Sequence, residues 1–148
     1  MMWAQEAKPG RRWVGRLPFQ GDLLESLEAF AAAKGVDAGW VNVIGAVKKA
    51  VIGFYDQKKK QYDHLEFNQE LEIVSCVGNV SIRQGRPAAH LHITLGDSRG
   101  HLYGGHLVRG TVVFAGEFYL QELLGLQLQR GFDQETGLPL WEKHIGST

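Results

Sequence analysis

The spacing of apolar side chains follows a helical period once along the chain, between residues 23 and 31. Leucine, phenylalanine and alanine recur there at intervals of three and four residues, which places them on one helix face. Asp22 can cap the start of this helix, Glu25 stands three residues later as in a capping box, and Gly35 suits its end. The pattern predicts one helix that packs on an apolar surface.

Most of the remaining chain predicts strands. β-branched and aromatic residues form short runs that alternate with polar residues and are separated by glycines and polar turns. About seven strands with one helix, without a strand–helix alternation, predict an α+β sandwich on a largely antiparallel sheet. The runs are residues 12–19, 41–47 and 50–55 (one long strand bent at Lys48-Lys49), 62–67, 71–82, 88–95, 102–108 and 111–120.

The composition is that of one globular domain. The 148 residues are 44% hydrophobic and 22% charged, and neither a linker nor a repeat divides them. We expect a loose leader at residues 1–11, a single domain at residues 12–141 and a tail at residues 142–148. No run approaches the roughly 20 apolar residues of a membrane span, and the N-terminus lacks the apolar stretch of a secretory signal. These features predict a cytoplasmic protein without a membrane partner.

Charge and cysteine content exclude other classes. Sixteen basic and sixteen acidic residues cancel, which argues against strong non-specific binding of nucleic acid, because that binding needs an excess of lysine and arginine. The single cysteine, Cys76, cannot form an intrachain disulfide, and its apolar neighbours predict a buried thiol rather than a reactive one.

Histidines cluster in two of the predicted strands. His90 and His92 are two residues apart, so on a strand they project from the same face, with Cβ atoms roughly 6 to 7 Å apart. A three-residue loop at residues 98–100 would place His106 opposite His92 on that face, whereas a two-residue loop would turn it to the other face. We expect His101, beside the turn, to be exposed to solvent.

The group of His90, His92 and His106 is open to several interpretations. Three neutral imidazoles suit Zn²⁺, with a water or a carboxylate as fourth ligand, and an open position could support hydrolysis. The histidines could instead be an acid/base pair, or polar side chains on a half-exposed sheet. Glu72 and Glu117 either support a ligand or lie exposed. Spacing alone leaves these alternatives open.

The sequence resembles the PPC (PCC) domain family. The signature half of that domain is similar to two segments, GRPAAHLHITLGD and GGHLVRGTVVFAGEF. The resemblance extends to GWVNVIGAVKKAVIGFYD, LEIVSCVGNVSI and GLPLW, and so covers residues 12 to 141. Its most specific feature is the order His-x-His, Leu-Gly-Asp and Gly-Gly-His-Leu.

This resemblance implies a fold, an assembly and a metal. The fold is an α/β sandwich with a seven-stranded antiparallel-type sheet and flanking helices, and the assembly is a homotrimer. Some stand-alone bacterial and archaeal members hold a metal, thought to be zinc, through motif histidines that match His90, His92 and His106. Plant members join the domain to AT-hooks that bind AT-rich DNA, and stand-alone members carry a DNA-binding label by inheritance.

The DNA-binding label has little support in this chain. An AT-hook core reads Arg-Gly-Arg-Pro and enters the minor groove. The nearest match, Gln84-Gly85-Arg86-Pro87, lacks the first arginine and lies in a predicted turn. Three hypotheses follow: a zinc-binding homotrimer of the PPC type, a small zinc-dependent enzyme of hydrolase type, and a metal-free trimeric assembly module.

Overall fold

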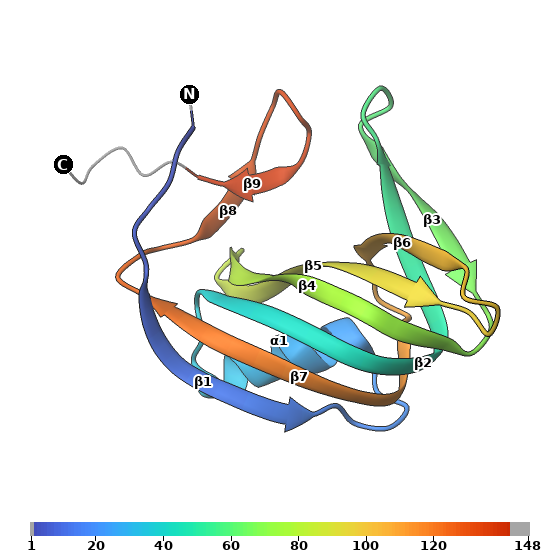
Figure 1. Ribbon diagram of the computed structural model, residues 1–148. Coiled ribbons are helices and arrows are strands. Elements are labelled where there is room, and N and C mark those ends of the chain that lie inside the picture. The colour runs from blue at the N-terminus through green and yellow to red at the C-terminus, as the bar shows by residue number, and fades with distance from the viewer. Residues whose placement is uncertain (1, 143–148) are drawn as a thin grey trace.

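The alternating runs of the sequence pair into one large sheet in the computed structural model, which describes residues 2–142 (Figure 1). The strand order is β1-β7-β2-β6-β5-β4-β8-β9, with β3 paired to β2 and a further pairing of β2 with β4. Every named strand pair in this part of the chain is antiparallel except β4 with β8. The strands are β1 (Lys8–Arg16), β2 (Gly39–Asp56), β3 (Gln61–Phe67), β4 (Leu71–Arg83), β5 (Arg86–Gly96), β6 (Leu102–Leu107), β7 (Val112–Leu124), β8 (Gln129–Phe132) and β9 (Pro139–Trp141).

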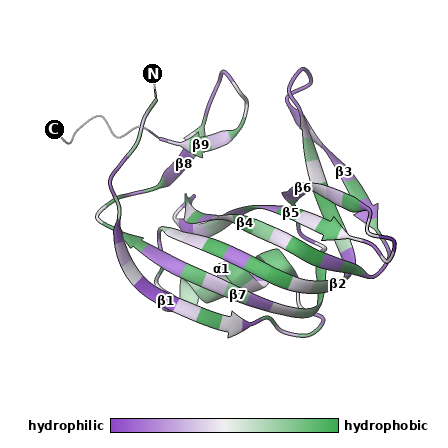
Figure 2. Ribbon diagram, in the orientation of Figure 1, coloured by the Kyte–Doolittle hydropathy of each residue, from purple (hydrophilic) through white to green (hydrophobic). Residues whose placement is uncertain are grey.

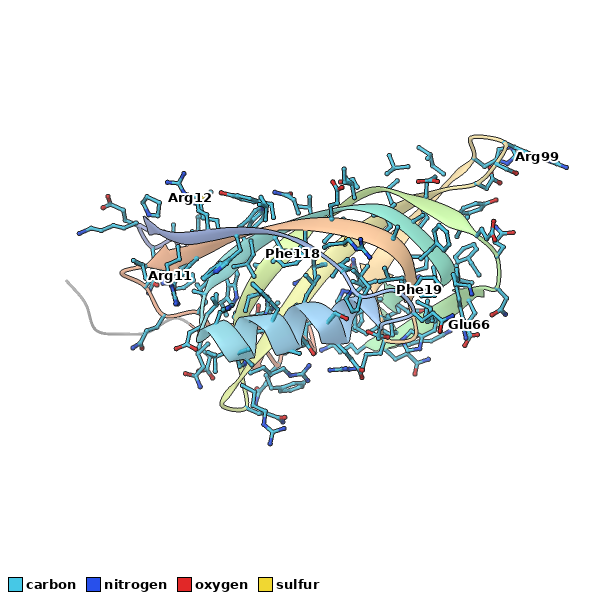
Figure 3. All side chains as sticks on the ribbon, turned by 90° about the horizontal axis from the view of Figure 1, so that it is seen from below. Arg11, Arg12, Phe19, Glu66, Arg99 and Phe118 are labelled. Atoms are coloured by element: carbon cyan, nitrogen blue, oxygen red, sulfur yellow. The ribbon has the colours of Figure 1, made fainter. Side chains whose placement is uncertain are left out.

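The predicted helix is confirmed as α1 (Leu23–Lys34). The side chain of Asp22 accepts a hydrogen bond from the backbone N–H of Glu25 at 2.9 Å, and Gly35 ends the helix with a φ of 62°. Figure 3 shows the helix along one face of the sheet, while the described residues place no helix on the other face. The molecule therefore has two layers.

The expected seven strands and flanking helices were wrong for residues 2–142, which form nine strands and one helix. The missed strands are β8 and β9, which are four and three residues long and too short to show an alternating pattern. They form because β8 pairs in parallel with the end of β4, and β9 pairs with β8. β1 also begins at Lys8, before the strand expected from Arg12.

The long bent strand is confirmed as β2, which runs for 18 residues. Its first half pairs with β4 and β7, and its second half pairs with β3 and β6. Register shifts between Val43 and Lys49 bend it between these two sets of partners. The bend lets one strand join the main sheet to the β2–β3 hairpin.

The core lies between α1 and the sheet. Leu23, Leu27 and Ala31 of the helix are fully buried against inward-facing strand residues. Cys76 is buried among them, and this burial raises the pKa of its thiol to about 12, so the prediction of a buried thiol is confirmed. Figure 2 shows hydrophobic and hydrophilic residues alternating along the strands, as one covered face requires.

Some expectations stay predictions. No helix in residues 2–142 combines the length and the apolar character needed to cross a membrane. A cytoplasmic location and the domain boundaries after residues 11 and 141 are untested predictions. Met1 and residues 143–148, which include most of the predicted tail, lie outside the described residues.

Candidate metal centre

The histidines of β5 lie on the face of the sheet that α1 does not cover. Leu91, Ile93 and Leu95 point into the core and are at most 2% exposed. Because successive strand residues point to opposite faces, His90 and His92 project away from the core.

The β5–β6 turn brings the third histidine to the same face. The backbone N–H of Asp97 donates to the carbonyl of His101 at 3.0 Å, which closes a loop of residues 98–100, and His92 pairs with His106 across the strands. The three-residue loop considered from the sequence is therefore the one formed. The Gly104-Gly105 pair introduces no register shift.

Asp97 stabilises this turn. Its carboxylate accepts hydrogen bonds from the backbone N–H groups of Arg99 and His101, each at 2.9 Å, and from the Tyr103 hydroxyl at 3.2 Å. Desolvation raises the pKa of Asp97, but these hydrogen bonds outweigh it and lower the pKa to about 2. The side chain of His101 pairs with Asp97 and is 63% exposed, as expected.

The three imidazoles are close enough to share one ion. One ring nitrogen from each of His90, His92 and His106 lies within 4.8 Å of the others. The ring centroids are 5.0 to 5.6 Å apart. His90 and His106 are partly buried, whereas His92 is exposed. The three-histidine cluster therefore lies at the protein surface, with His92 as its exposed member.

The two partly buried histidines, His90 and His106, are neutral at pH 7 because their pKa values are lowered. Burial, the charge of Arg130 and the neighbouring His92 lower the pKa of His90 to about 4. Burial and the same cluster of ionisable groups lower the pKa of His106 to about 4. Metal binding requires an unprotonated imidazole nitrogen, so both residues are in the ligand form at neutral pH.

One ring nitrogen in the cluster lacks a partner. Nδ1 of His106 is buried and has no hydrogen bond within residues 2–142. Leaving a buried polar atom unpaired costs free energy, and a metal ion is one partner that removes this cost. Three imidazoles are also a donor set that suits zinc. On both counts the residues present fit a zinc ion.

The next strands add aromatic and imidazole groups on the same face. Gly53 of β2 pairs with His106 on one side and with His64 of β3 on the other. The ring of Tyr62 lies 5.0 Å from that of His106 and 6.4 Å from that of His64. Tyr62 and His64 are two residues apart on a predicted strand, so spacing could have placed them on one face, but not beside His106.

An arginine from the C-terminal hairpin completes the site. Arg130 of β8 donates to Asn79 Oδ1 at 2.8 Å and to Ser81 Oγ at 2.7 Å, and it lies 3.4 Å from Nδ1 of His90. No sequence motif marks Arg130, because it lies 40 residues after His90 in a strand that the pattern does not predict.

A cavity of about 380 Å³ opens beside His90 and His106. Residues of the β2–β3 and β8–β9 hairpins line it. Figure 1 shows both hairpins rising above the rest of the sheet. They are linked where the Tyr55 hydroxyl donates to the Thr136 carbonyl at 2.7 Å, and the Lys60 ammonium donates to the Gln134 carbonyl at 3.0 Å. The cavity is thus bounded by both hairpins and by two of the three histidines.

The two glutamates considered from the sequence are not at this site. Glu72 and Glu117 are both exposed, and neither lines the cavity. In the described residues, the group of three or more possible metal ligands is His90, His92 and His106 alone. The fourth position of a tetrahedral ion would remain open to a water or a ligand.

The chain is similar to a known domain family and to several solved structures. The family model of the Plants and Prokaryotes Conserved (PCC) domain matches residues 4–124. A solved structure from Archaeoglobus fulgidus, described as a metal-containing protein, is 42% identical, with a TM-score of 0.91 over 96% of this chain and 100% of that one. A plant- and prokaryote-conserved (PPC) protein from Pyrococcus horikoshii is 35% identical, with a TM-score of 0.90 over 96% and 98% of the two chains.

Two further relatives carry other descriptions. A structure from Bacteroides thetaiotaomicron, described as a candidate DNA-binding protein, is 28% identical, with a TM-score of 0.81 over 92% of this chain and 96% of that one. The bifunctional protein GlmU of a Synechococcus strain is 32% identical over 123 residues, which are 82% of this chain. The chain spans only 18% of the length of that curated relative.

Proposed function

Since the chain belongs to the Plants and Prokaryotes Conserved (PCC) domain family, we propose that it is a metal-binding member that holds one zinc ion through His90, His92 and His106. The observation that carries the proposal is the convergence of three imidazoles within 4.8 Å, one of them with a buried, unpaired nitrogen. The metal-containing description of a relative that is 42% identical supports it.

Elemental analysis tests this proposal. Untagged protein is stripped by dialysis against a chelator, dialysed again to remove the chelator, and loaded with zinc. We expect about one zinc per chain, and near-complete loss in His92→Ala, because two neutral imidazoles hold zinc far more weakly than three. His92 is exposed, so its removal leaves the core intact.

His101→Ala is the matched control, because it removes an exposed imidazole from the neighbouring turn. It should bind zinc like the wild type. Wild-type protein that takes up no zinc, or a His92→Ala variant that still binds one equivalent, would contradict the three-histidine site.

A zinc-dependent enzyme of hydrolase type is a second candidate. The observation that favours it is the cavity beside His90 and His106, next to the open position of a three-ligand ion. Three protein ligands with an open position are typical of catalytic zinc, whereas structural zinc has four. When bound, zinc supplies Lewis acidity there.

We also propose that the protein assembles as a homotrimer through the open face of the sheet. Exposed apolar side chains on that face include Val14 at 84%, Ile44 at 57% and Trp40 at 43%. This face also carries the histidines of the proposed metal site. One row of cross-strand partners, which all point to the same face, runs from β1 to β6: Val14, Tyr119, Asn42, Val77, His92 and His106. Exposed apolar side chains that share one sheet face favour association with another surface.

DNA binding is suggested by the description of the 28% identical relative. The net charge of zero and the incomplete AT-hook match give it no further support in this chain. A DNA role would show as an affinity for duplex DNA that falls steeply as salt rises.

A further inference from the structure

Arg130 brings an unbalanced positive charge to the cavity. Its guanidinium donates to Asn79 Oδ1, Ser81 Oγ and the Pro139 carbonyl at 2.7 to 2.9 Å, and all three acceptors are neutral. Trp141 lies against it, with the guanidinium carbon 5.5 Å from the ring centre. Within residues 2–142, no carboxylate forms an ion pair with it. The protein holds this charge in place without neutralising it.

Metal binding at His90 would free one N–H group of Arg130. Nη2 of Arg130 faces Nδ1 of His90 at 3.4 Å, and a guanidinium nitrogen can only donate. If His90 binds a metal through Nδ1, that nitrogen has no free lone pair for Arg130. If it binds through Nε2, Nδ1 carries the proton and cannot accept. In either case the N–H on Nη2 loses its imidazole partner.

The guanidinium then has two donors for a ligand. Of its five N–H groups, three are bonded to Asn79, Ser81 and Pro139, and one faces His90. The fifth, on Nη1, has no partner among the described residues. Metal loading therefore leaves one N–H on each terminal nitrogen, which is the donor pair that a planar oxyanion accepts.

Charge and cavity shape define the ligand class. Three neutral imidazoles with a divalent ion place two positive charges beside the cavity, and Arg130, Arg83 and Lys60 add three cationic side chains to a lining that contains no carboxylate. Partly buried positive charges that lack a counter-charge favour an anionic ligand. The walls contributed by Tyr55, Tyr62, Leu138 and Pro139 are largely apolar or aromatic. They suit an organic body rather than a hydrated inorganic ion.

We propose that this cavity binds a small organic monocarboxylate, with its carboxylate between Arg130 and the open position of the metal and its apolar body against the hairpin walls. The inference rests on the proposed metal site and names its ligand class. It assigns Arg130 as a ligand-binding residue, and it makes carboxylate binding dependent on metal.

Calorimetric titration of the zinc-loaded protein tests the inference, with benzoate as the probe. Neutral benzamide and inorganic phosphate serve as comparison ligands. We expect saturable benzoate binding at least about tenfold tighter than benzamide or phosphate, because a charge-assisted contact is lost with the amide and the apolar contact with phosphate. Removal of zinc by dialysis against a chelator, which is then itself dialysed away, should weaken benzoate binding by about tenfold or more.

Arg130→Gln should weaken benzoate binding by a similar factor while zinc stoichiometry is unchanged. Arg99→Gln is the matched control, because Arg99 lies at the exposed tip of the β5–β6 turn and its loss removes the same charge (Figure 3). Arg130 also bonds β8 to β4, so thermal unfolding of both variants is measured. The comparison of zinc-loaded and zinc-free wild type needs no variant.

The outcomes separate the two proposals. Zinc uptake without benzoate binding, equal binding of benzoate and benzamide, or tighter binding of phosphate would overturn the carboxylate inference and leave the metal site standing. Absence of zinc uptake would overturn both.

Discussion

Glu122 is a buried carboxylate near the end of β7, and it does not line the cavity beside the histidines. Arg11 of β1 donates to it from Nε at 2.8 Å, from Nη2 at 2.7 Å and from its backbone N–H at 3.1 Å. These hydrogen bonds, with the charge of Arg11, lower the pKa of Glu122. Because β1 is the edge strand next to β7, this pair bonds the edge of the sheet to its interior.

At the scale of the residue, Glu122→Gln should lower the free energy of unfolding by about 1 kcal/mol at pH 7, since half of the Arg11 side chain is exposed. A lowered folded-state pKa means that the stabilisation exists above the unfolded-state pKa of about 4.3 and is lost as pH falls through the folded-state value. The difference between wild type and variant should shrink below pH ~4.

Urea unfolding at several pH values measures this difference. Glu66→Gln is the control, because Glu66 forms an exposed pair with Lys49 and should change stability little (Figure 3). A stability loss in Glu122→Gln that does not vary with pH would contradict an ionic role for Glu122.

At the scale of the element, the spacing between β4 and β5 depends on one glycine. Gly78 of β4 lies opposite Leu91, and a Cβ at Gly78 would overlap the carbonyl oxygen of His90. That carbonyl is backbone, so it cannot rotate away as a flexible side chain would. Only glycine allows β5 to approach closely where it carries the first proposed ligand.

Gly78→Ala should therefore move β5 and with it His90. We expect a loss of about 1–3 kcal/mol in the free energy of unfolding, as for other overpacked sites, and weaker zinc binding. Gly96→Ala is the matched control on the same pair of strands, because its nearest neighbours are side-chain atoms of Val74 and Leu102 at 3.2 and 3.7 Å. Equal stability and equal zinc affinity in the two variants would show that the strand spacing tolerates a methyl group.

At the scale of the whole molecule, α1 covers one face of the sheet, and no helix within residues 2–142 covers the other. The proposed trimer interface lies on this open face, beside the metal site. Ile44→Asp should convert the trimer to a monomer, because a carboxylate in an apolar interface is desolvated without a partner. Light scattering after size-exclusion chromatography measures the molar mass.

Leu65→Asp is the control for this experiment. Leu65 is 57% exposed, as Ile44 is, but it alternates with Tyr62 and His64 on β3 and so points to the other face. It should leave the molar mass unchanged. A monomeric wild type, or an Ile44→Asp variant with three chain masses, would exclude this face as the interface.

Several parts of the fold and the site follow from local sequence. The caps at Asp22 and Gly35 define α1, because capping is a contact between near neighbours in the chain. Alternation places His90 and His92 on one face, because successive strand residues always point in opposite directions. The pairing of His92 with His106 did not follow in this way, because the sequence allowed a two- or a three-residue loop and the structure shows the three-residue one.

The rest depended on contacts between distant segments, which only the tertiary structure decided. β8 and β9 are too short to be recognised by pattern and exist because the end of β4 offers an unpaired edge. Arg130 reaches His90 only through that pairing. The sequence by itself determined that His90 and His92 share a face, but it left open whether His106 joins them, because it did not fix the length of the loop between the strands. The packing of the two hairpins determined that His90 and His106 border a cavity, because the walls of that cavity come from strands that no local rule brings together.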